Sequence, residues 1–369
     1  MPHPIATAAY PENSLLAAEI QHQPRLWLDT LERVRAFLPG RSFGSGPVLL
    51  TGAGTSAYAG QAVAAAWPGA RAIATTDLML LAPDEIEAAA PGLASGGLLI
   101  SFARSGDSPE SVGVVRRMQA LFPMVQHLAI TCNAEGRLAH LAGVDVLALH
   151  PDTNDRSLAM TASFSNLTLA GLLLRNLESI APHLASIGNA LTQRLPDLYA
   201  TAYDIAGQDS ERFVVLASSM QSLAIESTLK TLELTAGQRL GIAESFLGFR
   251  HGPASALRRN TPVLCFASND RQKLRYEEDF VREFRDRGLG RFAVIGGEAA
   301  RSWPADWYIP ALAPVLPDAL RTPFEVVFSQ LFAYCSSLHA GIDPDNPSPD
   351  GQVTRVVKPF QLHPETGRS

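Results

Sequence analysis

The segment VLLTGAGTS (48–56) is followed directly by the alanine-rich run AYAGQAVAAAW (57–67). The apolar residues Val48 to Leu50 predict a short buried strand, and the glycines and hydroxyl residues after them predict a tight turn. The alanine-rich run favours a helix. A strand, a small-residue turn and a helix in this order form the building unit of parallel α/β sheets. This stretch therefore predicts an α/β protein.

The same order continues through the first half of the chain. The segment GGLLISFARSGDSPESVGVVRRM (96–118) again gives an apolar strand, a polar turn and a helix. Two further strands are expected within 127–132 and 144–150, and a helix from about Thr161. Short apolar strands that alternate with helices indicate a parallel sheet with helices on both faces.

The second half of the chain repeats the first. The matching segments are 211–234, 261–284, 291–297, 307–312 and 322–341. Corresponding units are separated by similar lengths of chain, which indicates a tandem duplication of a flavodoxin-like, three-layer α/β/α unit. We expect an N-terminal helical segment (1–44), a first domain (45–180), a connecting helix or linker (181–209), a second domain (210–342) and a C-terminal tail (343–369).

The composition restricts the class of protein. The chain has 369 residues, of which 46% are hydrophobic and 18% charged, and its net charge is −6. A nucleic-acid-binding face would require a basic excess that this chain lacks. No signal peptide and no membrane-spanning run are visible, and the three cysteines have no disulfide or metal spacing. We expect a cytoplasmic protein without nucleic-acid or membrane partners.

Two turns rich in hydroxyl residues follow neighbouring strands. Each one opens a helix, where free backbone N–H groups and the helix dipole favour an anion such as phosphate. Ordinary helix caps and tight turns would explain either turn by itself, but two of them on adjacent strands favour a phosphate site. The hydroxyl residues are Thr55, Ser56, Ser105 and Ser108.

A dinucleotide-binding site is the alternative for the first turn. GAGTSA (52–57) fits the relaxed fingerprint G-x-G-x-x-A, and Asp77 follows at a plausible distance. The second serine-rich turn is not explained by such a fold. A Thr-Ser pair inside the turn also suits a monophosphate better.

Three charged residues on one predicted helix are candidates for acid–base chemistry. Glu226, Lys230 and Glu233 are spaced i, i+4 and i+7 and therefore share a face. A solvated stripe with a weak ion pair would show the same spacing. If the face lies near the strand ends, a partly buried carboxylate there could move a proton beside a carbonyl group.

His251 is the histidine whose setting suits proton transfer. It lies in the Gly/Pro-bounded loop GFRHGP (248–253), just before a helix expected near Pro253. An exposed histidine changes its charge near neutral pH. A purely structural role is the alternative.

These motifs together resemble the SIS (sugar isomerase) family. TGAGTS (51–56) and SFARSGDSPESV (101–112) are similar to its paired phosphate loops. IESTLKTLELT (225–235) with FRHGP (249–253) resembles the catalytic segment in the isomerase half of glucosamine-6-phosphate synthase. TNDRSLAMTASF, LGFRHGP and DPDNPSP resemble the group of tagatose-6-phosphate ketose/aldose isomerases and galactosamine-6-phosphate deaminases. The resemblance covers almost the whole chain.

The resemblance implies a role for each candidate residue. Glu233 is the base that moves a proton between C1 and C2, Lys230 assists it, and His251 promotes ring opening. In the family this histidine reaches into the neighbouring subunit's site, which implies a homodimer. The residues that the resemblance places at the substrate phosphate are Thr55, Ser56, Arg104, Ser105, Ser108 and Thr161.

Departures from the synthase favour isomerisation with loss of ammonia. Position 2 is proline, where an N-terminal glutaminase would need cysteine, and Ala162 replaces a synthase lysine. The synthase's C-terminal catalytic lysine has no counterpart in SPDGQVTR (348–355). The expected reaction converts galactosamine- or glucosamine-6-phosphate to a ketose 6-phosphate without a metal or cofactor. A fructosamine-6-phosphate deglycase, a sugar-phosphate sensor and an NAD-binding protein are the alternatives.

Overall fold

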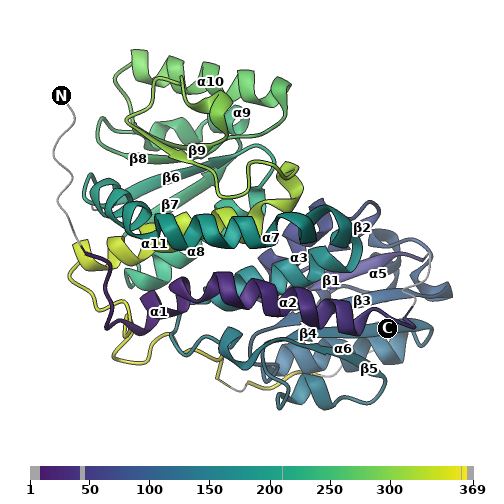
Figure 1. The fold of residues 1–369 in the computed structure, drawn as a ribbon. Coiled ribbons are helices and arrows are strands. Elements are labelled where there is room, and N and C mark those ends of the chain that lie inside the picture. Colours follow the sequence, from purple (N-terminus) through teal and green to yellow (C-terminus); the bar gives the residue numbers. More distant parts are fainter. Residues whose placement is uncertain (1–8, 42–45, 210, 359, 364–369) are drawn as a thin grey trace.

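Two parallel five-stranded sheets, one from each half of the chain, form the frame of the molecule (Figure 1). The computed structural model describes residues 9–41, 46–209, 211–358 and 360–363. Parts of the segments predicted at the two ends of the chain, 1–44 and 343–369, therefore lie outside the described residues.

The first sheet is built as the sequence predicts. Its order is β2-β1-β3-β4-β5, and all neighbouring strands run parallel. Every side chain of β1 is buried because helices cover both faces. The strands are β1 Val48–Thr51, β2 Ala70–Ala72, β3 Gly97–Ala103, β4 Val125–Thr131 and β5 Val144–Ala148.

The second sheet repeats this topology. Its order, β7-β6-β8-β9-β10, matches the first sheet strand for strand when β6 is set against β1. The tandem duplication is therefore confirmed; below, the first repeat runs from β1 to the start of α7 and the second from β6 to α11. The strands are β6 Arg212–Ala217, β7 Leu240–Glu244, β8 Pro262–Phe266, β9 Arg291–Gly296 and β10 Trp307–Pro310.

The helices form one shared layer between the sheets and an outer layer on each side. The shared layer contains α2 Gln23–Phe37, α3 Thr55–Ala65, α7 Ala162–Ala206, α8 Gln221–Leu234 and α11 Thr322–His339. The outer helices are α4 Thr75–Leu78, α5 Pro83–Ala89 and α6 Pro109–Leu121 beside the first sheet, and α9 Phe246–Phe249 and α10 Arg271–Asp286 beside the second. Short 3₁₀ turns occur at Leu93–Ser95, Arg137–His140, Pro151–Thr153, Pro253–Ala256, Glu298–Ala300 and Asp318–Leu320.

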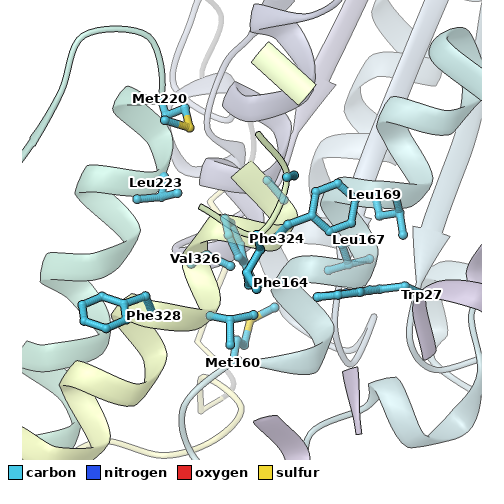
Figure 2. Packing of buried hydrophobic residues seen from close by; sticks show 14 of the residues in the cluster. Trp27, Met160, Phe164, Leu167, Leu169, Met220, Leu223, Phe324, Val326 and Phe328 are labelled. Atoms are coloured by element: carbon cyan, nitrogen blue, oxygen red, sulfur yellow. The ribbon is translucent and has the colours of Figure 1, made fainter. Parts of the chain in front are cut away.

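The shared layer contains the main hydrophobic core. Figure 2 shows Trp27 of α2 and Phe164 of α7 close to Phe324 of α11, and the ring centroids of Trp27 and Phe324 are 5.1 Å apart. Leu223 of α8 joins the same cluster. Because both sheets pack against these helices, the two repeats share this core, and each repeat has a further apolar cluster under its outer helices.

The long helix α7 connects the repeats. It bends at Asn176, where φ is −115° and ψ is 31°, and Pro182 follows within the helix. The helix thus continues across residue 180, where the sequence places a domain boundary, and the bend lies close to that position. The domain boundaries themselves stay a prediction.

The N-terminal and C-terminal segments meet beside α11. Ser14 caps α1 Leu15–Gln21 by accepting a hydrogen bond from the backbone N–H of Ala17. Asp345 accepts hydrogen bonds from the backbone N–H groups of Leu15 and Leu16, at 2.8 Å each. Within the described ranges, no helix combines the length and apolarity that crossing a membrane requires.

Candidate active site

The first predicted phosphate turn lies between β1 and α3. Gly54 has φ +54° and ψ −128°, a conformation that side-chain-bearing residues rarely adopt, and it starts the helix at Thr55. A Cβ added at Gly52 would lie 2.5 Å from the backbone of Ser56, so only glycine fits there. The backbone conformation of this turn therefore requires glycine at both positions of the GAGTS motif.

The second turn lies between β3 and α6. Ser108 precedes Pro109, the first residue of α6, and its Oγ lies 2.6 Å from Oγ of Ser111. Asn133, at the end of β4, donates a hydrogen bond through Nδ2 to the carbonyl of Ser105 at 2.9 Å. The hydroxyl of Ser108 does not cap its own helix and can therefore serve a ligand.

The two turns enclose a small cavity of about 100 Å³ at the carboxyl ends of β1 and β3. This is the point where the strand order reverses, which is where open α/β sheets bind ligands. Four of the residues predicted to bind the phosphate line the cavity. Ser111 and Arg355, which were not predicted from the sequence, line it as well. The four are Ser56, Arg104, Ser105 and Ser108.

Two other predicted phosphate residues make different contacts. Thr55 donates its hydroxyl hydrogen bond to Oε1 of Glu226, at 3.2 Å. The Thr161 hydroxyl donates to Asp155 at 3.1 Å, and Asp155 also accepts from the backbone N–H groups that begin α7. Met160, rather than Thr161, lines the cavity. Their roles at the phosphate stay a prediction.

Arg104 connects this cavity to other parts of the chain. Its guanidinium donates to the carbonyl of Leu158 at 3.0 Å and to the carbonyl of Arg355. Burial lowers the pKa of Arg104, and the charges of Asp155 and Glu233 partly oppose that effect. Arg104 therefore lies within electrostatic reach of Glu233 on α8.

The charged face of α8 is buried rather than solvated. Nζ of Lys230 forms ion pairs with Glu233 and, at 3.5 Å, with Oε1 of Glu226. Lys230 and Glu226 are almost fully buried, whereas 23% of the Glu233 side chain is exposed. The solvated stripe that the spacing also allowed is thus excluded.

The surroundings set the charges of this triad. Burial raises the pKa of Glu226 to about 8, and the nearby Lys230 only partly offsets it. Burial alone would lower the pKa of Lys230, but the two carboxylates raise it above its usual value. The triad therefore combines Glu226, which burial makes a weaker acid than usual, with the cationic Lys230 and the partly exposed Glu233.

Contacts from the first repeat complete the surroundings of the triad. Thr55 of α3 reaches Glu226, as described above. Tyr58, one turn further along α3, has its pKa raised by burial and by the charge of Glu226. The acid–base residues of one repeat are therefore held against the phosphate turn of the other.

A segment of the C-terminal tail, 347–357, covers both parts of this region, and we call it the strap. From Pro347 to Val353 it lines a cavity of about 710 Å³ together with Glu233. Arg355 then donates to the carbonyl of Asp155 at 2.6 Å and to Oδ1 of Asn154 at 2.5 Å. The strap thus runs from the side of Glu233 to the phosphate turns.

His251 lies outside this group of contacts. It is exposed and follows α9, at the carboxyl end of the edge strand β7. Its backbone N–H bonds to the carbonyl of Gly248, and within the described ranges its imidazole has no hydrogen bond or ion pair. A helix near Pro253 is present as the 3₁₀ turn Pro253–Ala256.

The arrangement provides anion donors at the carboxyl end of the first sheet, with a buried ammonium group and a partly exposed carboxylate on α8 beside them. Among the described residues, no group of three or more His, Cys, Asp or Glu side chains is placed to hold a metal ion. Ser111 could have been found from the sequence, since it lies one helical turn after Ser108. The position of Arg355 beside the phosphate turns could not be predicted from the sequence, because its hydrogen-bond partners are some 200 residues away in the chain.

Comparison with known proteins gives several matches along nearly the full chain. An AgaS protein of Streptomyces coelicolor is 40% identical, over 94% of each chain. The D-galactosamine-6-phosphate deaminase AgaS of Shewanella sp. strain ANA-3 is 34% identical, over 94% of this chain and 91% of that one. No protein-family model matches the chain.

Solved structures agree with the sequence matches. The tagatose-6-phosphate ketose/aldose isomerase of Escherichia coli has a TM-score of 0.82 and 32% identity, and covers 97% of this chain and 100% of its own. The C-terminal domain of a Francisella tularensis glucosamine-fructose-6-phosphate aminotransferase has a TM-score of 0.70 at 16% identity. That second likeness concerns the fold alone.

Proposed function

The chain belongs to the family of SIS-domain sugar-phosphate isomerases that includes the AgaS deaminases, and we propose that it converts an amino-sugar 6-phosphate to a ketose 6-phosphate and ammonia. It is an isomerase/deaminase of phosphorylated amino sugars. The observation that carries the reaction is the placement of Glu233, partly exposed and paired with Lys230, on the helix that contacts the first phosphate turn through Glu226 and Thr55. Galactosamine-6-phosphate and glucosamine-6-phosphate are the two candidate substrates.

The substrate phosphate occupies the cavity between the two turns of the first repeat. Hydroxyl groups of Ser56, Ser105 and Ser108 and free N–H groups at the starts of α3 and α6 bind its oxygens. Support comes from the cavity that these serines share. The phosphate then fixes the distance from the turns to the sugar carbons that react.

Glu233 is the base of the isomerisation. After ring opening, it takes the proton from C2 of the aldehyde form and returns a proton to C1. The amine at C2 becomes an imine, to which water adds, and ammonia leaves to give the C2 ketone. Lys230 holds the Glu233 carboxylate in place through their ion pair.

We also propose that the active form is a homodimer in which His251 promotes ring opening in the partner's site. Support comes from the exposed imidazole of His251, which has no bonded partner in its own chain among the described residues. Exposed apolar side chains also occur on elements of the same repeat: Leu232 of α8, Leu240 of β7 and Leu247 of α9 are 40%, 59% and 47% exposed. Such surface is typical of a subunit interface. A cytoplasmic location stays a prediction.

An ammonia-release assay tests the proposed reaction. Galactosamine-6-phosphate, glucosamine-6-phosphate and fructosamine-6-phosphate are compared, together with the two unphosphorylated amino sugars. We expect release from at least one amino-sugar 6-phosphate, with a ketose 6-phosphate formed in equal amount.

The same assay separates the alternatives. Turnover of fructosamine-6-phosphate alone would assign the deglycase reaction instead. Tight binding of a sugar phosphate without any turnover would indicate a sensor. Release from unphosphorylated sugars at the same rate would contradict the phosphate site.

A further inference from the structure

The second repeat has strand ends that correspond to the phosphate turns of the first. The strand orders of the two sheets match, so the ends of β6 and β8 are the counterparts of the ends of β1 and β3. Hydroxyl residues stand at these ends too: Ser219 follows β6, and Ser268 follows β8. A helix begins directly after each of them. The second repeat therefore carries the local geometry of an anion site.

Here the donors bind a carboxylate of the chain itself. The backbone N–H of Asn269 donates to Oδ1 of Asp318 at 2.8 Å, and the hydroxyl of Ser268 donates to Oδ2. The hydroxyl of Ser219 helps to lower the pKa of this carboxylate, and it accepts a hydrogen bond from Nζ of Lys273 at 2.7 Å.

A buried arginine completes the group. Nη1 of Arg321 donates to Oδ1 of Asp318 at 3.2 Å and to the carbonyl of Ala267 at 2.9 Å. Arg321 is fully buried, and its Nη2 has no hydrogen-bond partner among the described residues. Burial favours the neutral form of Asp318, but the surrounding donors outweigh it and lower its pKa. The carboxylate is thus a true anion bound by hydroxyl, N–H and guanidinium groups.

The first repeat differs at the corresponding place. The hydroxyl of Ser108 bonds that of Ser111, and a cavity lies beside them. In the second repeat, a separate cavity of about 180 Å³ lies next to Asp318, lined by Ser219, Ala319 and Thr322.

We propose that the second repeat retains an anion-binding site for a phosphate-type oxyanion and that the Asp318 carboxylate occupies it permanently. The chain then binds one substrate phosphate, although it contains two repeats with the same topology. The second repeat keeps its strand-end turns in order without a ligand, which suits its task of holding Glu233 and Lys230 in place.

Equilibrium dialysis of the full chain with radiolabelled inorganic phosphate tests this inference. We compare wild type with Asp318→Ala and expect the variant to bind one additional phosphate per chain. Both are also measured with Ser105→Ala and Ser108→Ala present, which weakens the first site. A gain caused by Asp318→Ala in both backgrounds is independent of the phosphate site proposed for catalysis.

Asp306→Ala is the matched control. Asp306 also accepts a backbone hydrogen bond, from Phe292 at 2.8 Å, and pairs with Arg285 and Arg291, but it lies away from the strand-end turns. Both variants should lose thermal stability in chloride buffer. With the first site weakened by Ser105→Ala and Ser108→Ala, phosphate at equal ionic strength should raise the Tm of Asp318→Ala by more than that of Asp306→Ala.

An unchanged phosphate count in folded Asp318→Ala would overturn the proposal. If that variant does not fold in chloride, Asp318→Ser is purified and its Tm measured in phosphate and in chloride. A phosphate-specific rise in Tm larger than that of wild type supports the proposal, and a rise no larger than that of wild type contradicts it.

Discussion

The three charged residues of α8 differ in how far they are open to a substrate. Glu226 and Lys230 are buried, and only Glu233 keeps an exposed part. A base must reach the proton that it removes. Of the three residues, Glu233 is the one that a substrate can reach. Spacing along the helix places all three on one face but contains no information on which of them a substrate can touch.

Glu233→Gln should lower kcat by about 10²-fold to 10⁴-fold while substrate still binds, because the amide keeps the shape but cannot take a proton. Steady-state kinetics and a substrate-binding titration measure the two effects. Wild type should also place solvent deuterium at C1 of the ketose product. Glu244→Gln is the comparison variant; if it is inactive while Glu233→Gln turns over normally, the base lies at Glu244.

Glu226→Gln should change the pH dependence of stability. The pKa of Glu226 is about 8 in the folded chain and 4.5 as the ordinary value, so the folded chain holds a proton that the unfolded chain releases. The stability from this proton is complete at low pH and is lost as pH rises through about 8. Glutamine cannot lose a proton, so the Tm of the variant should rise relative to wild type between about pH 5 and pH 8.5.

The difference between the two melting curves isolates Glu226. Glu19 and Glu277 also have their pKa raised to about 7, mainly by burial, but both contribute equally to wild type and variant. A Tm difference that does not vary with pH would mean that Glu226 is charged throughout this range.

At the scale of single elements, the turns after β1 and β3 were the most predictable part of the molecule. Glycines, serines and a proline after apolar strands determine the turn and the start of each helix locally. The edge strand β7, Leu240–Glu244, gave no such signal, because its sequence LGIAE has no apolar run and most of its side chains are only half-buried.

Ser105→Ala and Ser108→Ala should each raise KM for the phosphorylated substrate by about tenfold or more, because a hydrogen bond to a charged group contributes about 1.5–3 kcal/mol. Kinetics and a thermal melt together check that binding is lost without unfolding. Ser179→Ala, at an exposed position of α7, is the control. If both turn variants keep the wild-type KM, this loop does not bind the substrate phosphate.

Arg355→Ala should loosen the strap. The variant loses the hydrogen bonds to Asn154 and to the carbonyl of Asp155, which hold the strap against the phosphate turns. Hydrogen–deuterium exchange of residues 347–358 should become faster, and KM should rise. Lys358→Ala removes a nearby exposed cation and serves as the control. Unchanged exchange in Arg355→Ala would show that other contacts hold the strap.

For the whole molecule, the repeat was visible in the sequence but the shared core was not. The strand order of each sheet follows from alternating strands and helices, because right-handed crossovers leave few topologies. How the repeats face each other depends on packing between their helices, such as α3 against α8, which no local pattern encodes. Ser56, Ser105 and Ser108 could be predicted to lie together, because they follow neighbouring strands of one sheet. The contact of Thr55 with Glu226 could not be predicted, because it joins the two repeats.

Mixing two inactive variants tests the homodimer. His251→Ala and Glu233→Gln should each be nearly inactive alone but regain activity after subunit exchange, because a mixed dimer contains one site with both wild-type residues. Random pairing gives about half mixed dimers with one intact site of two, so about a quarter of wild-type activity is the ceiling. Verified exchange without recovered activity would place His251 in its own chain's site or outside catalysis.

The hydrogen bond from Thr55 to Glu226 has a consequence for how the enzyme selects its substrate. Thr55 and Ser56 are the first two residues of α3, so the helical turn that faces the phosphate also holds a member of the proton-transfer triad. Binding energy from a remote group can then be used to organise the reacting centre, and a substrate without that group loses turnover rate as well as affinity. We therefore expect the phosphate to act as a built-in activator, so that a sugar lacking it would be turned over slowly even at saturation.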